Sequence, residues 1–327
     1  MSIELELKEE KNVVAHSPRG SKLQIDALLI FITLIWGGTF LVVQNTIKLT
    51  GPFTFLTIRF SFAALALMLI FHKRLARITR RELITGGIIG LFLFATYALQ
   101  TCGLQYTTTS KAGFITALYV PLVPLLSILL LRQWPTLGAI LGVGLSLTGL
   151  SLLSINDQFN LDFGLGEFLV FACAITCSLH IVSISKFAPK VDAINLAIVQ
   201  ITVTALLSLM AMPLAGEPFA LPPLPVWGSA FFMGLIATSF PLVVMNRVQQ
   251  FISSTRATLI YALEPVFAGF FGYLSGELLT MQALLGCALI FMGMIMAELK
   301  PRELWQTLSL RKRAPTILTV ESVAVGE

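Results

Sequence analysis

The chain has 327 residues, of which 56% are hydrophobic and only 12% are charged, about half the charged fraction of a soluble globular domain. Its formal net charge is +5, but the basic residues lie in short gaps between apolar runs, which argues against a nucleic-acid-binding surface and is typical of membrane orientation. The four cysteines lie inside apolar runs without a CxxC pair, so they indicate neither a disulfide framework nor a metal site.

The apolar runs predict helices that cross a membrane. A helix that rises about 1.5 Å per residue needs about 20 apolar residues to cross a hydrocarbon core of about 30 Å. The first run follows a charged tail and has no small-residue cleavage site behind it, so we expect a retained helix and not a signal peptide. The sequence predicts an all-α integral membrane protein with ten transmembrane helices at residues 25–44, 54–72, 83–102, 110–131, 137–154, 164–186, 192–213, 226–247, 256–275 and 281–299.

The distribution of basic residues predicts the orientation of these helices. With the N-terminus inside, only Lys48 and Lys111 fall in loops on the outer side, and Arg59 falls inside a span. Basic residues favour the cytoplasmic side of a membrane. We therefore expect a multi-pass protein of the inner (plasma) membrane, with cytoplasmic tails at 1–23 and 300–327.

The chain carries an internal repeat. Displacing the sequence by 144 residues places Ser110 on Ser254 and Pro121 on Pro265, and nine of the forty pairs that start at 110–149 are identical. Each copy holds five predicted spans, an odd number, so the second copy enters the membrane from the opposite side. We therefore predict two inverted repeats, 24–155 and 156–299, an architecture that supports alternating access around one central site.

Several motifs resemble the drug/metabolite transporter superfamily, and its EamA-type branch in particular. The matching residues are Trp36-Gly37-Gly38-Thr39-Phe40, Arg59-Phe60, Pro121 with Gly138 and Gly142, and Glu264-Pro265-Val266-Phe267-Ala268 with Gly276-Glu277 and Gly286. One departure is that Arg132-Gln133 stands where the family usually has a glycine-glutamate pair. The resemblance implies a ten-helix carrier with a central cavity that exports amino acids, related metabolites or drugs.

Glu264 is the acidic residue that lies deep inside a predicted span. It is about eight residues, or about 12 Å, from the cytoplasmic end, and an unpaired carboxylate at this depth costs a few kcal/mol. One hypothesis is that Glu264 lines the cavity and couples transport to protons. The alternative is a structural carboxylate that caps backbone groups freed by Pro265 or pairs with Arg59.

His180 and Arg59 are the other ionisable candidates within spans. His180 belongs to a polar stripe with Cys173, Thr176 and Ser183, and it is either a proton-relay partner of Glu264 or a polar packing residue. Arg59 could extend toward the outer surface or hold a carboxylate at the cavity mouth.

Aromatic and amide side chains complete the predicted site, although each alone is often a packing or interface residue. Our substrate-binding set is Trp36, Thr39, Arg59, Tyr97, Gln100, Tyr119, His180, Asn246, Tyr261 and Glu264, with Glu264 and His180 as coupling candidates. Pairs such as Gly86 and Gly90 have the spacing that lets two helix backbones approach closely. The two helices could belong to one chain or to two copies in a homodimer.

Missing motifs narrow the function. The sequence has no GxxxxGK[ST] loop for ATP and no HExxH or GxSxG motif of an enzyme, so we expect no cofactor and no catalysis. We predict a secondary transporter, an exporter of amino-acid-like zwitterionic or neutral metabolites. Efflux of amphiphilic drugs or cations is the second hypothesis, and a passive channel or a non-transporting membrane scaffold is the third.

Overall fold

The computed structural model describes residues 19–131, 137–154, 163–252, 254–276 and 280–298, and every regular element in these ranges is helical. The elements in chain order are α2 (Arg19–Thr46), α3 (Pro52–Ile70), α4 (His72–Leu75), α5 (Arg80–Gly103), α6 (Thr109–Thr116), α7 (Tyr119–Leu131), α8 (Leu137–Ser154), α9 (Leu165–Phe187), η1 (Ala188–Lys190), α10 (Ala193–Leu214), α11 (Leu224–Phe232), η2 (Met233–Ser239), α12 (Phe240–Val248), α13 (Ser254–Tyr261), α14 (Glu264–Leu274) and α15 (Met281–Glu298).

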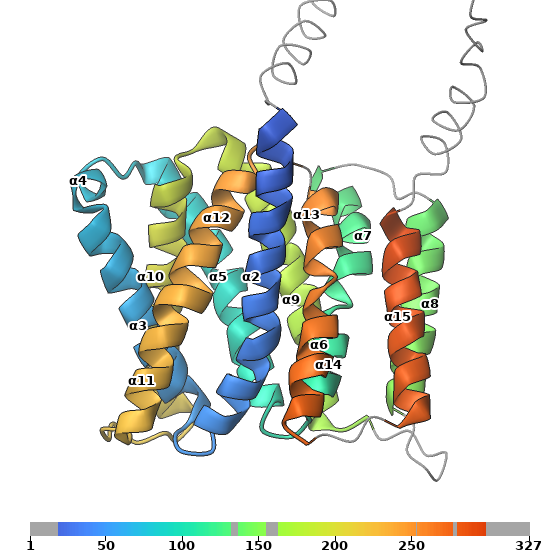
Figure 1. The fold of residues 1–327 in the computed structure, drawn as a ribbon. Helices are drawn as coiled ribbons and strands as arrows, with labels where there is room; N and C mark the ends of the chain where they lie inside the picture. Colours follow the sequence, from blue (N-terminus) through green and yellow to red (C-terminus); the bar gives the residue numbers. More distant parts are fainter. Residues whose placement is uncertain (1–18, 132–136, 155–162, 253, 277–279, 299–327) are drawn as a thin grey trace, which may run out of the picture.

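The helices lie side by side in a bundle (Figure 1) and follow the predicted segments closely. Seven helical segments of the described residues are long and apolar enough to cross a membrane. The predicted segments at 137–154, 256–275 and 281–299 fall on α8, on α13 with α14, and on α15, so their crossing stays a prediction. α2 begins at Arg19, within the tail predicted at 1–23, and its apolar span begins at Gln24, so the extent of the tail stays a prediction. Residues 300–327, Gln133 and Glu277 lie outside the described residues.

Two helices of the bundle are interrupted at corresponding places. α6 ends at Thr116 and α7 begins at Tyr119, while α13 ends at Tyr261 and α14 begins at Glu264. A proline follows each restart, Pro121 in α7 and Pro265 in α14. Proline lacks a backbone N–H and disfavours helical dihedrals in the residue before it, which accounts for a break in the preceding turn.

The order of the helices repeats with nearly the same displacement as the sequence. α7 begins at Tyr119 and α14 begins at Glu264, 145 residues later, which differs by one residue from the displacement of 144 found in the sequence. Packing follows the same correspondence, because α7 packs against α9 where α14 packs against α2. α8 and α15 pair with each other at one edge of the bundle (Figure 1).

α3 and α10 are corresponding helices that pack against each other, and a carboxylate from another segment caps the N-terminus of each. Glu217, which follows α10, accepts hydrogen bonds from the backbone N–H groups of Phe53 and Thr54 at 2.9 and 2.7 Å. At the opposite end, Glu82 accepts one from the N–H of Asp192 at 3.1 Å. These carboxylates satisfy helix N-terminal donors, which otherwise have no intrahelical partner.

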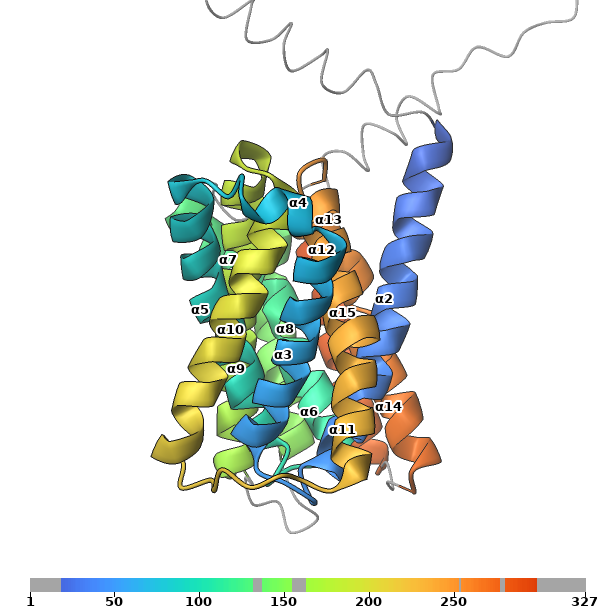
Figure 2. The ribbon, with the colours of Figure 1, turned by 90° about the vertical axis from the view of Figure 1, so that its left-hand side faces the viewer.

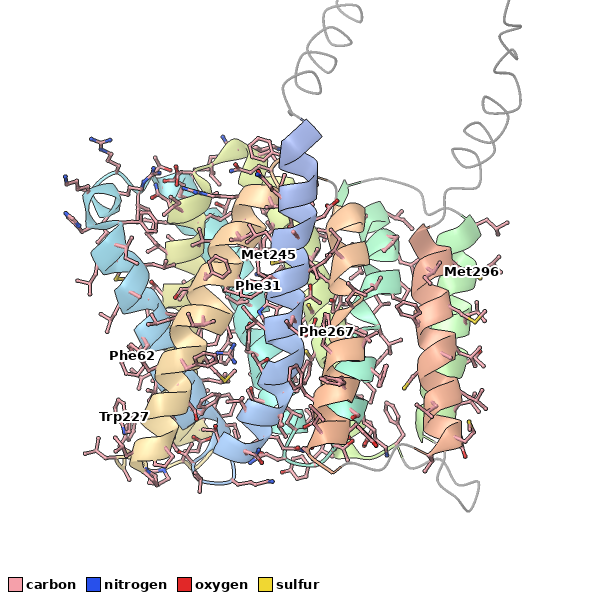
Figure 3. All side chains as sticks on the ribbon, in the orientation of Figure 1. Phe31, Phe62, Trp227, Met245, Phe267 and Met296 are labelled. Atoms are coloured by element: carbon pink, nitrogen blue, oxygen red, sulfur yellow. The ribbon has the colours of Figure 1, made fainter. Side chains whose placement is uncertain are left out.

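The outer surface of the bundle is apolar along its length. Phe62 of α3 and Trp227 of α11 pack edge to face, with ring centroids 6.2 Å apart, on the side of the bundle shown at the left of Figure 3. α2 begins and α15 ends at the same end of the bundle, where α4 also lies (Figures 1 and 2). An apolar perimeter with charged ends matches a protein whose lateral solvent is lipid.

Candidate functional site

A cavity lies in the middle of the bundle, between helices from both halves of the chain. Its volume is about 60 Å³, which leaves room for a few water molecules, so a metabolite would need neighbouring side chains to move. The residues that line it are Trp36, Thr39, Leu93, Thr96, Tyr97, Gln100, Thr116, Tyr119, Cys177, His180, Ile181, Leu242, Met245, Tyr261 and Glu264.

The two helix interruptions meet at this cavity. Tyr119 is the first residue of α7 and Glu264 is the first residue of α14. The Tyr119 hydroxyl donates a hydrogen bond of 3.1 Å to Oε2 of Glu264, and the Glu264 side chain is buried, with 8% of the residue exposed. The site therefore holds a buried carboxylate with a neutral donor beside it.

An aromatic wall faces this carboxylate. The rings of Trp36 and Tyr261 lie 5.5 Å apart, and Trp36 Nε1 donates a hydrogen bond of 3.0 Å to the carbonyl oxygen of Ala237. Ala237 belongs to η2, a π-helical turn. π-Helical turns are rare and occur often at functional sites. Their backbone can leave a carbonyl group free to accept a hydrogen bond from another segment, as Ala237 does from Trp36.

The remaining wall is built from hydroxyl, amide and imidazole groups. His180 Nε2 lies 2.9 Å from Oε1 of Gln200, and Thr96 donates to Thr176 at 3.1 Å. His180 lines the same cavity as Glu264, but its hydrogen-bond partner is Gln200 of α10. A hydrogen bond to the Gln200 amide therefore fixes the His180 side chain, and Gln200 is not among the predicted site residues.

Arg59 does not line the cavity, in contrast to the prediction. Its side chain is 1% exposed, its Nε donates to Thr238 Oγ1 at 2.8 Å, and its guanidinium carbon lies 4.7 Å from the ring centroid of Tyr97. In this conformation Arg59 does not extend outward, and no carboxylate among the described residues forms an ion pair with it. The suggested pairing with Glu264 is therefore wrong for this conformation.

Asn246 is the second predicted residue that does not line the cavity. Its Nδ2 donates to the carbonyl oxygen of Leu242 in its own helix at 2.7 Å, whereas its buried Oδ1 has no hydrogen-bond partner among the described residues. The other eight predicted residues surround one cavity. Thr96, Thr116 and Cys177 line it too but were missed, because small polar side chains in apolar runs give little signal.

Other predicted features can be placed as well. The described residues contain no group of three metal-ligating side chains. A Cβ on Gly86 or Gly90 would meet Val199 or Val203 at 2.6 and 2.8 Å, so these glycines let α5 approach α10 within the chain. This contact explains the glycine spacing without a second copy.

Comparison with known proteins gives a consistent family signal. A model described as the EamA-like transporter family matches residues 23–155 and again 164–299. An uncharacterized transporter of Archaeoglobus fulgidus is 32% identical, over 85% of this chain and 87% of its own length.

More distant similarities cover most of the chain as well. The uncharacterized transporter YoaV of Bacillus subtilis is 26% identical over 82% of this chain and 94% of its own length. A Chlamydia muridarum protein named S-adenosylmethionine/S-adenosylhomocysteine transporter is 23% identical over 78% and 86%. A crystal structure with 21% identity superposes with a TM-score of 0.62, over 85% of this chain and 98% of that chain, which shows a shared fold.

Proposed function

Because the chain belongs to the EamA-like transporter family, we propose that it is a secondary transporter that exports small amino-acid-like metabolites across the inner membrane. In this proposal ten helices span the membrane as two inverted repeats, 24–155 and 156–299, with both termini in the cytoplasm. The two halves exchange conformations and open the central cavity to one side at a time.

The repetition of elements supports the inverted repeat. The interrupted pairs α6–α7 and α13–α14 occupy corresponding places, and α7 packs against α9 where α14 packs against α2. The family model also matches the chain twice. Two halves of similar fold can adopt inward-open and outward-open states of comparable free energy, which alternating access requires.

The observation that carries the proposal is Glu264 in the cavity between the halves. A buried carboxylate is costly unless it binds a proton, a cation or a donor, and Tyr119 supplies one neutral hydrogen bond. An ammonium group or a proton could alternately occupy this carboxylate. Exchange of these two occupants would couple export of a primary amine to inward movement of protons.

A second substrate class is favoured by the aromatic wall. Trp36 and Tyr261 pack beside the carboxylate, and aromatic faces bind organic cations. The relative named for S-adenosylmethionine accords with this class, since that compound is an amino acid that carries a sulfonium cation. Amphiphilic cations are therefore the second candidate for the same cavity.

Reconstitution tests the proposal. Proteoliposomes that contain the purified protein are loaded with a bacterial metabolite extract, and the solutes that leave are identified by mass spectrometry with protein-free liposomes as the control. We expect protein-dependent loss of one or a few amines or zwitterions. A loss of many unrelated solutes would indicate a channel, and no protein-dependent loss would contradict transport.

A further inference from the structure

Arg59 is a buried cation that the proposed function has not yet used. It is the basic residue of α3, and the ion pairs found among the described residues are Arg74–Asp192 and Lys111–Glu167. Arg59 therefore has no carboxylate partner in the part of the chain that the structure describes. An uncompensated charge in a membrane interior costs several kcal/mol, which packing alone does not justify.

The internal repeat shows that packing does not need arginine here. The position that corresponds to Arg59, 144 residues later, is Val203. A Cβ on Gly90 would meet the side chain of Val203 at 2.8 Å, whereas a Cβ on Gly234 would meet the backbone oxygen of Arg59 at 2.6 Å. The contact of Gly234 with α3 therefore uses the backbone of Arg59 and not its guanidinium, so the charge of Arg59 serves something other than this helix contact.

A single ring separates Arg59 from the cavity. Tyr97 stacks on the guanidinium carbon at 4.7 Å, and Tyr97 also lines the cavity together with Glu264. The η2 turn holds the arrangement in place, since Thr238 accepts the Arg59 Nε hydrogen bond and the adjacent Ala237 accepts the Trp36 bond. Rotation of the Tyr97 side chain would open the guanidinium to the cavity.

We propose that Arg59 is the carboxylate-binding half of the substrate site, covered by Tyr97 in this conformation. The substrate is then a zwitterion whose ammonium group is bound at Glu264 and whose carboxylate is bound by the guanidinium fork, a geometry that matches two carboxylate oxygens at once. This inference rests on the proposed function and narrows it to α-amino acids and close derivatives that keep a free carboxylate.

The test compares acids with their amides. Ligand-induced shifts in melting temperature are measured on the purified full-length protein with a panel of L-amino acids and the matching L-amino acid carboxamides, which keep the size and the ammonium group but lack the negative charge. We expect the wild type to bind at least one acid about tenfold or more tightly than its amide. Arg59→Gln should reduce this ratio to about one while amide binding is unchanged, Arg59→Lys should keep part of it, and the surface variant Lys48→Gln should keep all of it.

Removal of the Tyr97 ring gives a second test of the proposal, and this test does not depend on whether an Arg59 variant folds. Tyr97→Leu should increase the ratio of acid to amide affinity, because the bound conformation no longer requires the ring to move. An unchanged ratio in both Arg59→Gln and Tyr97→Leu, or an equal loss of acid and amide binding, overturns the role of Arg59 and leaves amine transport standing. If the wild type binds neither acids nor amides, the proposed substrate class fails and this inference fails with it.

Discussion

The Tyr119 hydroxyl lies 3.1 Å from Oε2 of Glu264, and this hydrogen bond joins the first residues of two half-helices, α7 and α14. The two residues are 145 positions apart and come from the two copies of the repeat. In the proposed mechanism one half moves against the other, and this movement would change the contact. We therefore propose that the bond responds both to the occupant of Glu264 and to the conformation of the transporter.

Tyr119→Phe removes the hydroxyl and keeps the ring. A hydrogen bond to a carboxylate contributes about 1.5–3 kcal/mol, so we expect transport in proteoliposomes to fall by about tenfold or more, with a folded protein. Tyr106→Phe is the matched control, because Tyr106 is 60% exposed. Equal rates for wild type and Tyr119→Phe would show that the bond does not contribute to transport.

Gly234 tests the contact that holds η2 against α3. A Cβ at this position would lie 2.6 Å from the Arg59 backbone oxygen, whereas a Cβ on Gly228 would meet nothing within 4 Å. Steric overlap of this kind costs about 1–3 kcal/mol. We expect Gly234→Ala to lower the melting temperature by several degrees in detergent and Gly228→Ala to leave it unchanged or slightly higher. Similar melting temperatures would argue against a close η2–α3 contact.

Most of the fold could be predicted because apolar runs and proline breaks are local signals. The predicted segment at 137–154 coincides with α8, and Glu264 was identified because an acidic residue is rare in such a run. Gln200 was overlooked although an amide inside the run at 192–213, which holds Asn195 and Gln200, is a comparable signal. The positions of Arg59 and Asn246 could not be predicted, since helix rotation and the π-helical turn η2 depend on packing that a linear pattern does not encode.

The proposed orientation can be checked with single cysteines in a variant that lacks the four native ones. Arg77, next to α4, and Ala215, after α10, are exposed at opposite ends of the bundle. In intact cells we expect an impermeant maleimide to label Ala215→Cys and to label Arg77→Cys after lysis alone. The reverse pattern would place the termini outside and contradict the positive-inside assignment.

The central claim is that Glu264 carries the coupling proton, and proton flux in proteoliposomes tests it most directly. A pH-sensitive dye is enclosed in the vesicles, a solute identified by the metabolite-export assay is added to one side, and solute and proton movement are recorded together. Glu264→Gln keeps the size and hydrogen-bonding capacity of the side chain but removes its titration. We predict that the wild type moves protons with the solute, whereas folded Glu264→Gln exchanges solute across the membrane without proton movement. Solute-dependent proton flux in Glu264→Gln equal to that of the wild type would contradict the account.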